Sequence, residues 1–215
     1  MVVDFFINAP NEEGKYSNIP SMKEGLQFFK SIFDSDNHKC IEEVFPKGSH
    51  VIIHVKDNHA KLQVIGAITF AIMPCGIWIN FLASKGSKFL AQSFSNGDGL
   101  SFQERGVGCF FIQLIFHFSC SLKKFGLIHS SEIYLKTPSK NADSSKNKVL
   151  TYYQNLGFQK QKPVPQSILV FCSVEKGKSV DFRYKGDEAK NGILMTLVRD
   201  PWRKNFQNIN EKQGA

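Results

Sequence analysis

Three consecutive segments with the composition of β-strands lie between residues 50 and 84. HVIIHVKD, KLQVIGAITFAIM and GIWINFLAS are rich in β-branched and aromatic residues. DNHA and PCG separate them, and both are typical of tight turns. Such short connections join antiparallel strands, because a parallel pair needs a crossover of a dozen or more residues. The chain is therefore predicted to form an antiparallel sheet, with residues 77–83 near its centre because that segment is apolar on both faces.

Helices are predicted before this sheet. Residues 21–33 have helical periodicity, and Glu24 stands three residues after Ser21, the spacing of a capping box. The expected apolar face carries Met22, Leu26, Phe29 and Ile32 or Phe33. A second helix is predicted for residues 37–45, stopped by Pro46.

A long loop without clear periodicity, residues 85–101, follows the sheet. Residues 109–122 are apolar nearly all round and predict a buried helix that ends at Gly126. The remaining predicted elements are a strand at 131–137, a linker at 138–147, a helix at 149–158 closed by Gly157, and strands at 167–174 and 192–199.

Composition limits the domain count and the class of partner. A chain of 215 residues with 42% hydrophobic content supports one sizeable core. We expect one domain over residues 21–200, an irregular N-terminal arm at 1–20 and a C-terminal tail at 201–215. Lys and Arg number 27 against 19 Asp and Glu, and the formal net charge of +8 favours an anionic ligand or partner.

Five cysteines without a CxxC pair predict buried free thiols in a reducing compartment. The longest apolar stretches are too short to span a bilayer. The N-terminus MVVDFFINAP lacks a basic flank before an apolar core, as a signal peptide would have. We therefore expect an intracellular protein, cytoplasmic or nuclear, with no membrane partner.

The segment QERGVG, residues 103–108, stands between the strands and the buried helix. Glycines at such a junction leave backbone N–H groups pointing at a ligand, and the helix N-terminus adds about half a positive charge. The segment is therefore predicted to hold an anion such as a pyrophosphate. The chain has no GxxxxGK[ST] and no GxGxxG in a parallel βαβ unit, which argues against a P-loop or a dinucleotide-binding fold.

Gln103-x-x-Gly106-x-Gly108 resembles the Q/R-x-x-G-x-G/A loop that binds the acyl-coenzyme A pyrophosphate in the GNAT (general N-acetyltransferase) superfamily. Tyr153-x-x-x-Gly157-Phe158 resembles the Y-x-x-x-G-F segment that follows the fifth strand of that superfamily. The resemblance extends over residues 21–160 in the order of elements. It implies an α/β (α+β) fold with a mixed, mostly antiparallel sheet of six to seven strands, flanked by about four helices.

The sequence departs from the superfamily in its connecting segments. The loop at 85–101 and the linker at 138–147 are long, and residues 159–191 separate the Tyr153 motif from the last predicted strand. Val149 stands where the superfamily has a small residue, and neither Asn141 nor Asn147 is in register with its frequent asparagine. The parts that select the acceptor are therefore expected to be unusual.

The resemblance implies a site for acetyl-coenzyme A (acetyl-CoA) where the strand at 77–83 splays from the strand at 131–137. The pantetheine amides would pair with backbone near Leu82 and Ala83, as an added strand pairs with a sheet edge. The pyrophosphate would be bound by Gln103, Arg105, Gly106, Val107, Gly108 and Cys109. The implied reaction is direct transfer, in which an amine attacks the thioester.

Tyr153 matches the position of the general acid that protonates the leaving thiolate, although the same residue could simply pack between helix and sheet. The general base stays open, because residues 61–73 and 77–83 contain no Asp or Glu. The alternatives are Glu42, Glu43, Glu104, a histidine or water. Cys109 lies in the first helical turn, where the dipole lowers a thiol pKa, but an acyl-enzyme is not expected there.

Metal binding is not expected from the histidines. His50 and His54 would share a face of one strand but lie about 13 Å apart, too far to bind one zinc ion. Between residues 121 and 165 the chain has eight Lys, Glu132 and Asp143. This basic stretch could bind the 3′-phosphate of the coenzyme or nucleic acid, or it could be a solvated face.

The sequence thus predicts an acetyl-CoA-dependent N-acetyltransferase that uses acetyl-CoA as co-substrate, with no metal. The acceptor is an amine, either a protein Lys or N-terminus or a small molecule. The alternative is a catalytically inactive GNAT-fold binding module that contacts protein or nucleic acid through its basic face.

Overall fold

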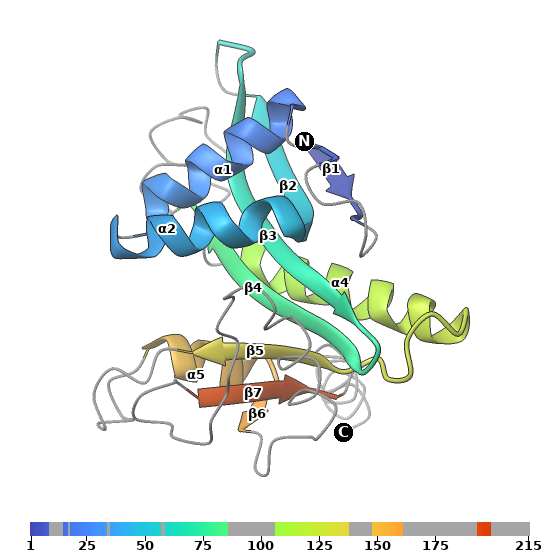
Figure 1. Ribbon diagram of the computed structural model, residues 1–215. Coiled ribbons are helices and arrows are strands. Elements are labelled where there is room, and N and C mark those ends of the chain that lie inside the picture. The colour runs from blue at the N-terminus through green and yellow to red at the C-terminus, as the bar shows by residue number, and fades with distance from the viewer. Residues whose placement is uncertain are drawn as a thin grey trace, which may run out of the picture. The chain divides into compact units, whose positions relative to one another are not determined.

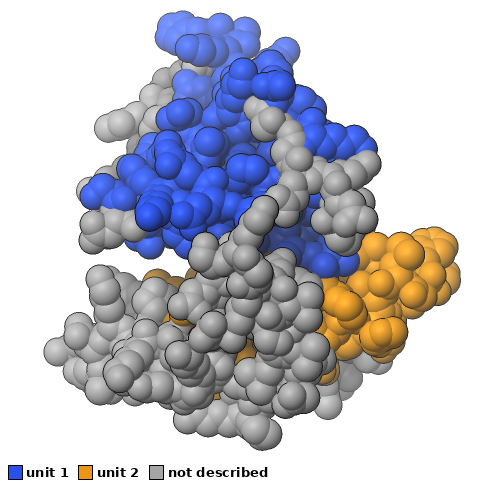
Figure 2. Space-filling view, in the orientation of Figure 1, with its two compact units in different colours: residues 1–72, 79–112 blue, residues 73–78, 113–215 orange. Residues whose placement is uncertain are grey.

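The computed structural model describes residues 1–8, 15–16, 18–33, 35–56, 59–85, 106–137, 148–160 and 193–198. The chain divides into two compact units (Figure 2). Unit 1 comprises Met1–Ile72 and Ile79–Ile112, and unit 2 comprises Met73–Trp78 and Gln113–Ala215. The domain boundaries expected at residues 20 and 200 remain predictions.

Seven strands form a mixed sheet in the order β1-β2-β3-β4-β5-β7-β6, and the described residues contain four α-helices (Figure 1). The strands are β1 Val2–Phe6, β2 Ser49–Lys56, β3 Leu62–Met73, β4 Gly76–Ser84, β5 Ile133–Thr137, β6 Gln159–Lys160 and β7 Ile193–Leu197. The helices are α1 Pro20–Ile32, α2 Ser35–Val44, α4 Val107–Lys124 and α5 Lys148–Asn155, with a 3₁₀ turn at Phe45–Lys47. The predicted α/β architecture, strand number and helix number are confirmed.

Unit 1 contains β2 and most of β3 and β4, the three strands predicted from the strand-like segments between residues 50 and 84. Strand β2 pairs antiparallel with β3, with a register shift between Ile53 and His54. Strand β1 pairs antiparallel with β2, from Val2 opposite His54 to Phe6 opposite His50. The irregular arm expected for residues 1–20 is therefore wrong for residues 2–6. Pairing with β2 orders this segment, and the Phe5 ring also contacts that of Phe70 in β3.

Helix α1 begins one residue earlier than the predicted capping box. Its N-cap is Ile19, which makes no side-chain cap hydrogen bond, and Pro20 occupies the first helical position. Proline suits that position because its φ is preset and its missing N–H has no intrahelical partner there. The buried face carries Met22, Gly25, Phe28 and Phe29. Ile32, one of two candidates for that face, is instead 45% exposed.

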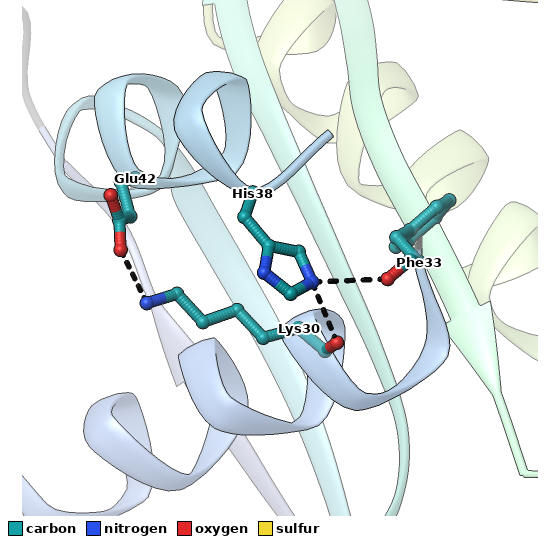
Figure 3. A network of polar contacts seen from close by, with 4 residues as sticks. All are labelled: Lys30, Phe33, His38 and Glu42. Carbon is teal, nitrogen blue, oxygen red and sulfur yellow. Dashed lines mark hydrogen bonds and ion pairs between the residues drawn. The ribbon is translucent and has the colours of Figure 1, made fainter. Parts of the chain in front are cut away.

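Helix α2 follows α1 closely, and side chains tie the two together (Figure 3). The His38 Nε2 atom lies 2.9 Å from the carbonyl oxygen of Lys30 and 3.1 Å from that of Phe33. These carbonyls belong to the last turn of α1 and to its C-cap residue, where helix geometry provides no further backbone donor. Lys30 also forms an ion pair with Glu42 of α2, which helps to hold the two helices side by side.

The core of unit 1 is built from aromatic side chains under α1 and α2. The Phe29 ring lies 5.9 Å from that of Phe45 and 6.1 Å from those of Phe33 and Phe81, measured between centroids. Helix α1 packs tightly on β2, since a Cβ atom at Gly25 would come within 2.6 Å of Ile52 Cδ1. Of the apolar face that the periodicity predicted, Met22 and Phe29 are buried, and Leu26 and Phe33 are partly buried against the same core.

His50 of β2 is a buried titratable group within this core. Its side chain is 1% exposed and its ring centroid lies 4.1 Å from that of Phe45. Burial lowers the His50 pKa to about 4. The ring is therefore neutral in the folded protein at neutral pH.

This pKa predicts a loss of stability in acid. The unfolded state, with a His pKa of about 6.5, takes up the proton before the folded state does. The His50 contribution is therefore complete above pH 6.5 and falls by about 3 kcal/mol as the pH decreases to 4. Urea unfolding of wild type and His50→Phe at both ends of this window measures it. The same pH dependence in both proteins would contradict the prediction.

Unit 2 pairs β5 with β7 and β7 with β6, both antiparallel. Helices α4 and α5 end as predicted at glycines, with φ of +72° at Gly126 and +94° at Gly157. The Leu127 N–H donates to Leu122 O at 2.9 Å and the Phe158 N–H to Tyr153 O at 3.0 Å. Both ends are Schellman motifs, in which glycine takes the left-handed conformation.

Some predictions concern residues outside those described: the strand at 167–174, most of the loop at 85–101, the linker at 138–147 and the C-terminal tail. Cys40, Cys75, Cys109 and Cys120 are thiols rather than disulfides. Only Cys75 among them is fully buried and Cys40 is exposed, so the expected burial is wrong for Cys40. No helix in the described ranges is long and apolar enough to cross a membrane.

Candidate functional site

The N-terminus of α4 begins at the predicted anion-binding segment. The Gly106 carbonyl accepts the first helical hydrogen bond, from the Phe110 N–H at 2.6 Å. Val107, Gly108 and Cys109 occupy the following positions, where helix geometry gives an N–H group no intrahelical acceptor. These N–H groups and the helix dipole make this end of α4 attractive to an anion.

Gly106 is required by the backbone at this point. Its φ is +83°, and a Cβ atom there would lie only 2.7 Å from Cys109 Cβ. A side chain would therefore be both strained and crowded, which glycine avoids. Gln103 and Arg105, the other predicted residues of this loop, lie outside the described residues.

Strand β3 supports the start of α4. A Cβ atom at Gly66 would come within 2.6 Å of Val107 Cγ1 and 2.9 Å of Phe111 Cε2. The first turns of α4 therefore contact the β3 backbone directly. Gly66 was not among the residues predicted for the site, although an isolated glycine within a strand pattern signals such a close approach.

The end of β4 is predicted to pair with pantetheine. Ile65 of β3, the residue before Gly66, holds it in place. Leu82 is half-buried and Ala83 is buried. The Lys85 N–H donates to Ile65 O at 2.8 Å, and Ile65 precedes Gly66. Residues 65 and 66 thus hold both the end of β4 and the start of α4. The structure brings the two predicted parts of the coenzyme site together on β3, within unit 1.

Two further groups near this point carry shifted pKa values. Burial lowers the Lys85 pKa, and the Lys85 Nζ atom donates to Gln63 Oε1 at 3.5 Å. Burial raises the Cys109 pKa, which is the opposite direction from the dipole effect expected from its place in the helix. Cys109 therefore remains a protonated thiol at neutral pH, which makes it a poor nucleophile.

Tyr153 lies on α5 in unit 2. Its ring packs edge-on against Phe158, at 5.4 Å between centroids, and against Tyr152 at 5.2 Å. Burial raises the Tyr153 pKa, so its phenol keeps its proton at neutral pH. A general acid must carry that proton, whereas the ring contacts also suit a residue that only packs.

The candidate bases differ in their surroundings. Glu42 is exposed, and the hydrogen bond and charge of Lys30 lower its pKa, which weakens it as a base. Glu43 is exposed on α2, and Glu104 lies outside the described residues. Thr69 Oγ1 and Asn80 Oδ1 are buried, and no described residue forms a hydrogen bond with either atom. Buried polar atoms of this kind usually bind ordered water, which keeps water among the alternatives.

His54 of β2 lies between two carboxylate side chains. The His54 Nε2 atom lies 3.1 Å from Asp4 Oδ2, and its Nδ1 atom lies 3.6 Å from Glu24 Oε2. His54 thus connects β1, β2 and α1 within unit 1. Across the described parts of the chain, no three His, Cys, Asp or Glu side chains gather as a metal site.

The solved structures that are similar to this chain include several acetyltransferases. The crystal structure of GCN5 from Tetrahymena matches with a TM-score of 0.53 and 19% identity, over 94% of this chain and 98% of that chain. The catalytic domain of Tetrahymena GCN5 histone acetyltransferase with coenzyme A matches at 0.45 and 19%, over 92% and 93%. The PaiA N-acetyltransferase of Thermoplasma acidophilum with coenzyme A matches at 0.40 and 11%, over 93% and 100%.

No protein-family model matches the sequence, and no curated protein matches it either. The structural likeness therefore rests on the order and pairing of the elements. The match to the GCN5 crystal structure spans nearly all of both chains. This chain has the fold of the GNAT superfamily.

Proposed function

We propose that this protein is an acetyl-CoA-dependent N-acetyltransferase that transfers the acetyl group directly to an amine. The observation that carries the proposal is the junction on β3, where residues 65 and 66 hold the end of β4 next to the glycine-rich start of α4. This arrangement offers an extended backbone for amides and a helix N-terminus for phosphates. The GNAT fold supports the same assignment.

In this proposal, the N–H groups of Val107, Gly108 and Cys109 bind the pyrophosphate, assisted by Gln103 and Arg105. The backbone at Leu82 and Ala83 pairs with the pantetheine amides. Neither interaction requires a charged side chain, which agrees with the glycines at positions 106 and 108. The residues therefore bind and orient the co-substrate mainly through their backbone.

The reaction joins the acceptor nitrogen to the thioester carbonyl carbon and breaks the carbon–sulfur bond. The Tyr153 phenol donates its proton to the departing thiolate, and water takes the proton released by the amine. The raised pKa of Tyr153 keeps the phenol protonated before transfer. Water is the proposed base because β3 and β4 contain no carboxylate.

Tyr153→Phe tests the acid role while it preserves the ring contacts with Phe158 and Tyr152. We expect kcat to fall by about 100-fold, because general acid catalysis typically contributes 10²–10⁴. The KM for acetyl-CoA and the urea unfolding midpoint should stay close to those of wild type. Tyr152→Phe, on the adjacent exposed residue, is the matched control. An unchanged kcat in Tyr153→Phe would assign Tyr153 to packing alone.

The proposed activity is tested by following release of the coenzyme A thiol with a panel of acceptors. The panel contains Lys peptides, peptides with a free N-terminus and small primary amines. Acceptor-dependent thiol release, with the mass of the acetylated product, supports the proposal. Binding of acetyl-CoA without transfer to any acceptor would favour the inactive binding module, for which the absence of a carboxylate on β3 and β4 is the specific argument.

A further inference from the structure

Residues Lys123–Leu127 form the end of α4 and the turn that follows it, called the Lys123–Leu127 turn below, and present two large apolar side chains to solvent. Phe125 is 74% exposed and Leu127 is 67% exposed. Most large apolar side chains of the described residues are buried. Two such residues on one turn form an apolar surface that calls for an explanation.

The backbone of this turn is held by hydrogen bonds. The Phe125 N–H donates to Ser121 O and the Gly126 N–H to Lys123 O, both at 3.0 Å. The His129 N–H donates to Pro74 O at 2.7 Å, which attaches the following residues to the β3–β4 turn. In glycine-ended helices the residue after the glycine often packs back on the helix. Leu127 instead faces solvent on an ordered turn.

The charged side chains of this turn are both positive. Lys123 and Lys124 are both exposed and immediately precede Phe125. Residues 107–131 contain no Asp or Glu, so no acidic side chain of α4 or its turn neutralises them. A surface that covers the turn should therefore be negatively charged and should accept apolar groups.

The small size of the apolar surface helps to decide between a protein partner and a lipid bilayer. A specific protein interface usually buries about 800 Å² on each partner, far more than two side chains supply. A bilayer needs only a few apolar side chains in its interfacial region, together with lysines near the lipid headgroups. The turn therefore suits a lipid surface better than a protein partner.

We propose that the Lys123–Leu127 turn binds an anionic lipid surface. Phe125 and Leu127 enter the interfacial region, and Lys123 and Lys124 contact headgroup phosphates. The contact is peripheral and needs no spanning helix. The last turns of α4 are drawn in yellow-green at the right of Figure 1, and the described residues of unit 2, to which they belong, are orange in Figure 2.

This surface is separate from the proposed coenzyme site. Helix α4 has 18 residues, which places its two ends roughly 25 Å apart at 1.5 Å per residue. Substitutions in the turn should therefore leave acetyl-CoA binding unchanged. The lipid proposal and the proposed activity can fail independently.

Vesicle sedimentation of the full chain tests the lipid proposal. Wild type should bind vesicles of phosphatidylserine and phosphatidylcholine, and not pure phosphatidylcholine. The double variant Phe125→Ser, Leu127→Ser should bind at least about tenfold more weakly, because both apolar anchors are lost. The variant Lys123→Glu, Lys124→Glu should lose binding to a similar or greater extent.

The matched control is Ile32→Ser, Val149→Ser, which removes two exposed apolar side chains elsewhere, each 45% exposed. This control should bind as wild type does. The proposal is overturned if wild type remains in the supernatant, or if the Phe125 and Leu127 variant binds normally. It is also overturned if the control loses binding equally. Wild type that ignores vesicles but binds polyglutamate would assign the turn to an acidic protein.

Discussion

Gly106→Glu is expected to weaken acetyl-CoA binding by at least about 100-fold, equivalent to about 2.7 kcal/mol. A Cβ atom at this position would lie 2.7 Å from Cys109 Cβ, so the side chain must distort the start of α4. The φ of +83° adds strain for any residue other than glycine. The carboxylate also brings negative charge next to the proposed pyrophosphate site, where repulsion opposes binding. Competition against a fluorescent coenzyme A derivative measures the change.

Gly126→Glu is the matched control for this prediction. It introduces the same side chain at a glycine beside the other end of α4, with a φ of +72° and no heavy atom within 4 Å of the added Cβ. The two variants therefore have similar backbone strain and the same added charge, but only Gly106→Glu places that charge beside the proposed coenzyme site. Equal affinities for acetyl-CoA in both variants would contradict a site at the N-terminus of α4.

Gly76→Ala is expected to destabilise the protein by about 4 kcal/mol. The alanine Cβ would lie 2.3 Å from Glu132 O and 3.2 Å from Glu132 C, both backbone atoms. The Ile77 N–H donates to the same carbonyl at 3.0 Å, so relief of the clash breaks a hydrogen bond between β4 and the residue before β5. Overpacking costs about 1–3 kcal/mol and a strained φ a similar amount. Urea unfolding gives the free energy directly.

Gly126→Ala isolates the cost of backbone strain. It shares a positive φ with Gly76 but would meet no neighbouring atom, so we expect a loss of only about 1 kcal/mol. The difference between the two variants measures the close approach of Gly76 to Glu132. A similar loss of stability in both would show that the contact at Gly76 relaxes without cost.

Much of the fold follows from local signals in the sequence. Strands β2, β3 and β4 are rich in β-branched and aromatic residues and lie between turn sequences, so their bounds depend on few distant contacts. The glycines at 126 and 157 ended their helices as expected, because the left-handed conformation that they adopt is a local property. Pro46 likewise stopped α2 through its own ring.

The parts that the sequence did not predict depend on partners distant in the chain. Strand β1 is ordered by its pairing with β2, and the two residues of β6 form a strand only beside β7. Ser21 does not cap α1, because Pro20 already occupies the first helical position. Cys40 lies on the exposed face of α2. The apolar residue next to it, Ile41, is buried, so the sequence around Cys40 wrongly suggested burial.

The candidate site shows the same division. The glycine segment before α4 was found because its spacing and its place after strands are visible in the sequence. Gly66 matters to the site because it lies against Val107, and Ile65 because its carbonyl accepts a hydrogen bond from the Lys85 N–H. Both partners lie far along the chain. Thr69 and Asn80 looked like ordinary strand residues until the structure showed their oxygen atoms buried. A general base cannot be assigned by spacing, since it depends on such contacts.

Calorimetric titration of folded wild type with acetyl-CoA tests the central claim most directly. We predict saturable binding of one molecule per chain with a Kd in the micromolar range, about −8 kcal/mol, and competition by coenzyme A. Absence of binding at millimolar acetyl-CoA, in a sample that unfolds cooperatively in urea, would contradict it. The start of α4 would then be only a connection between a strand and a helix.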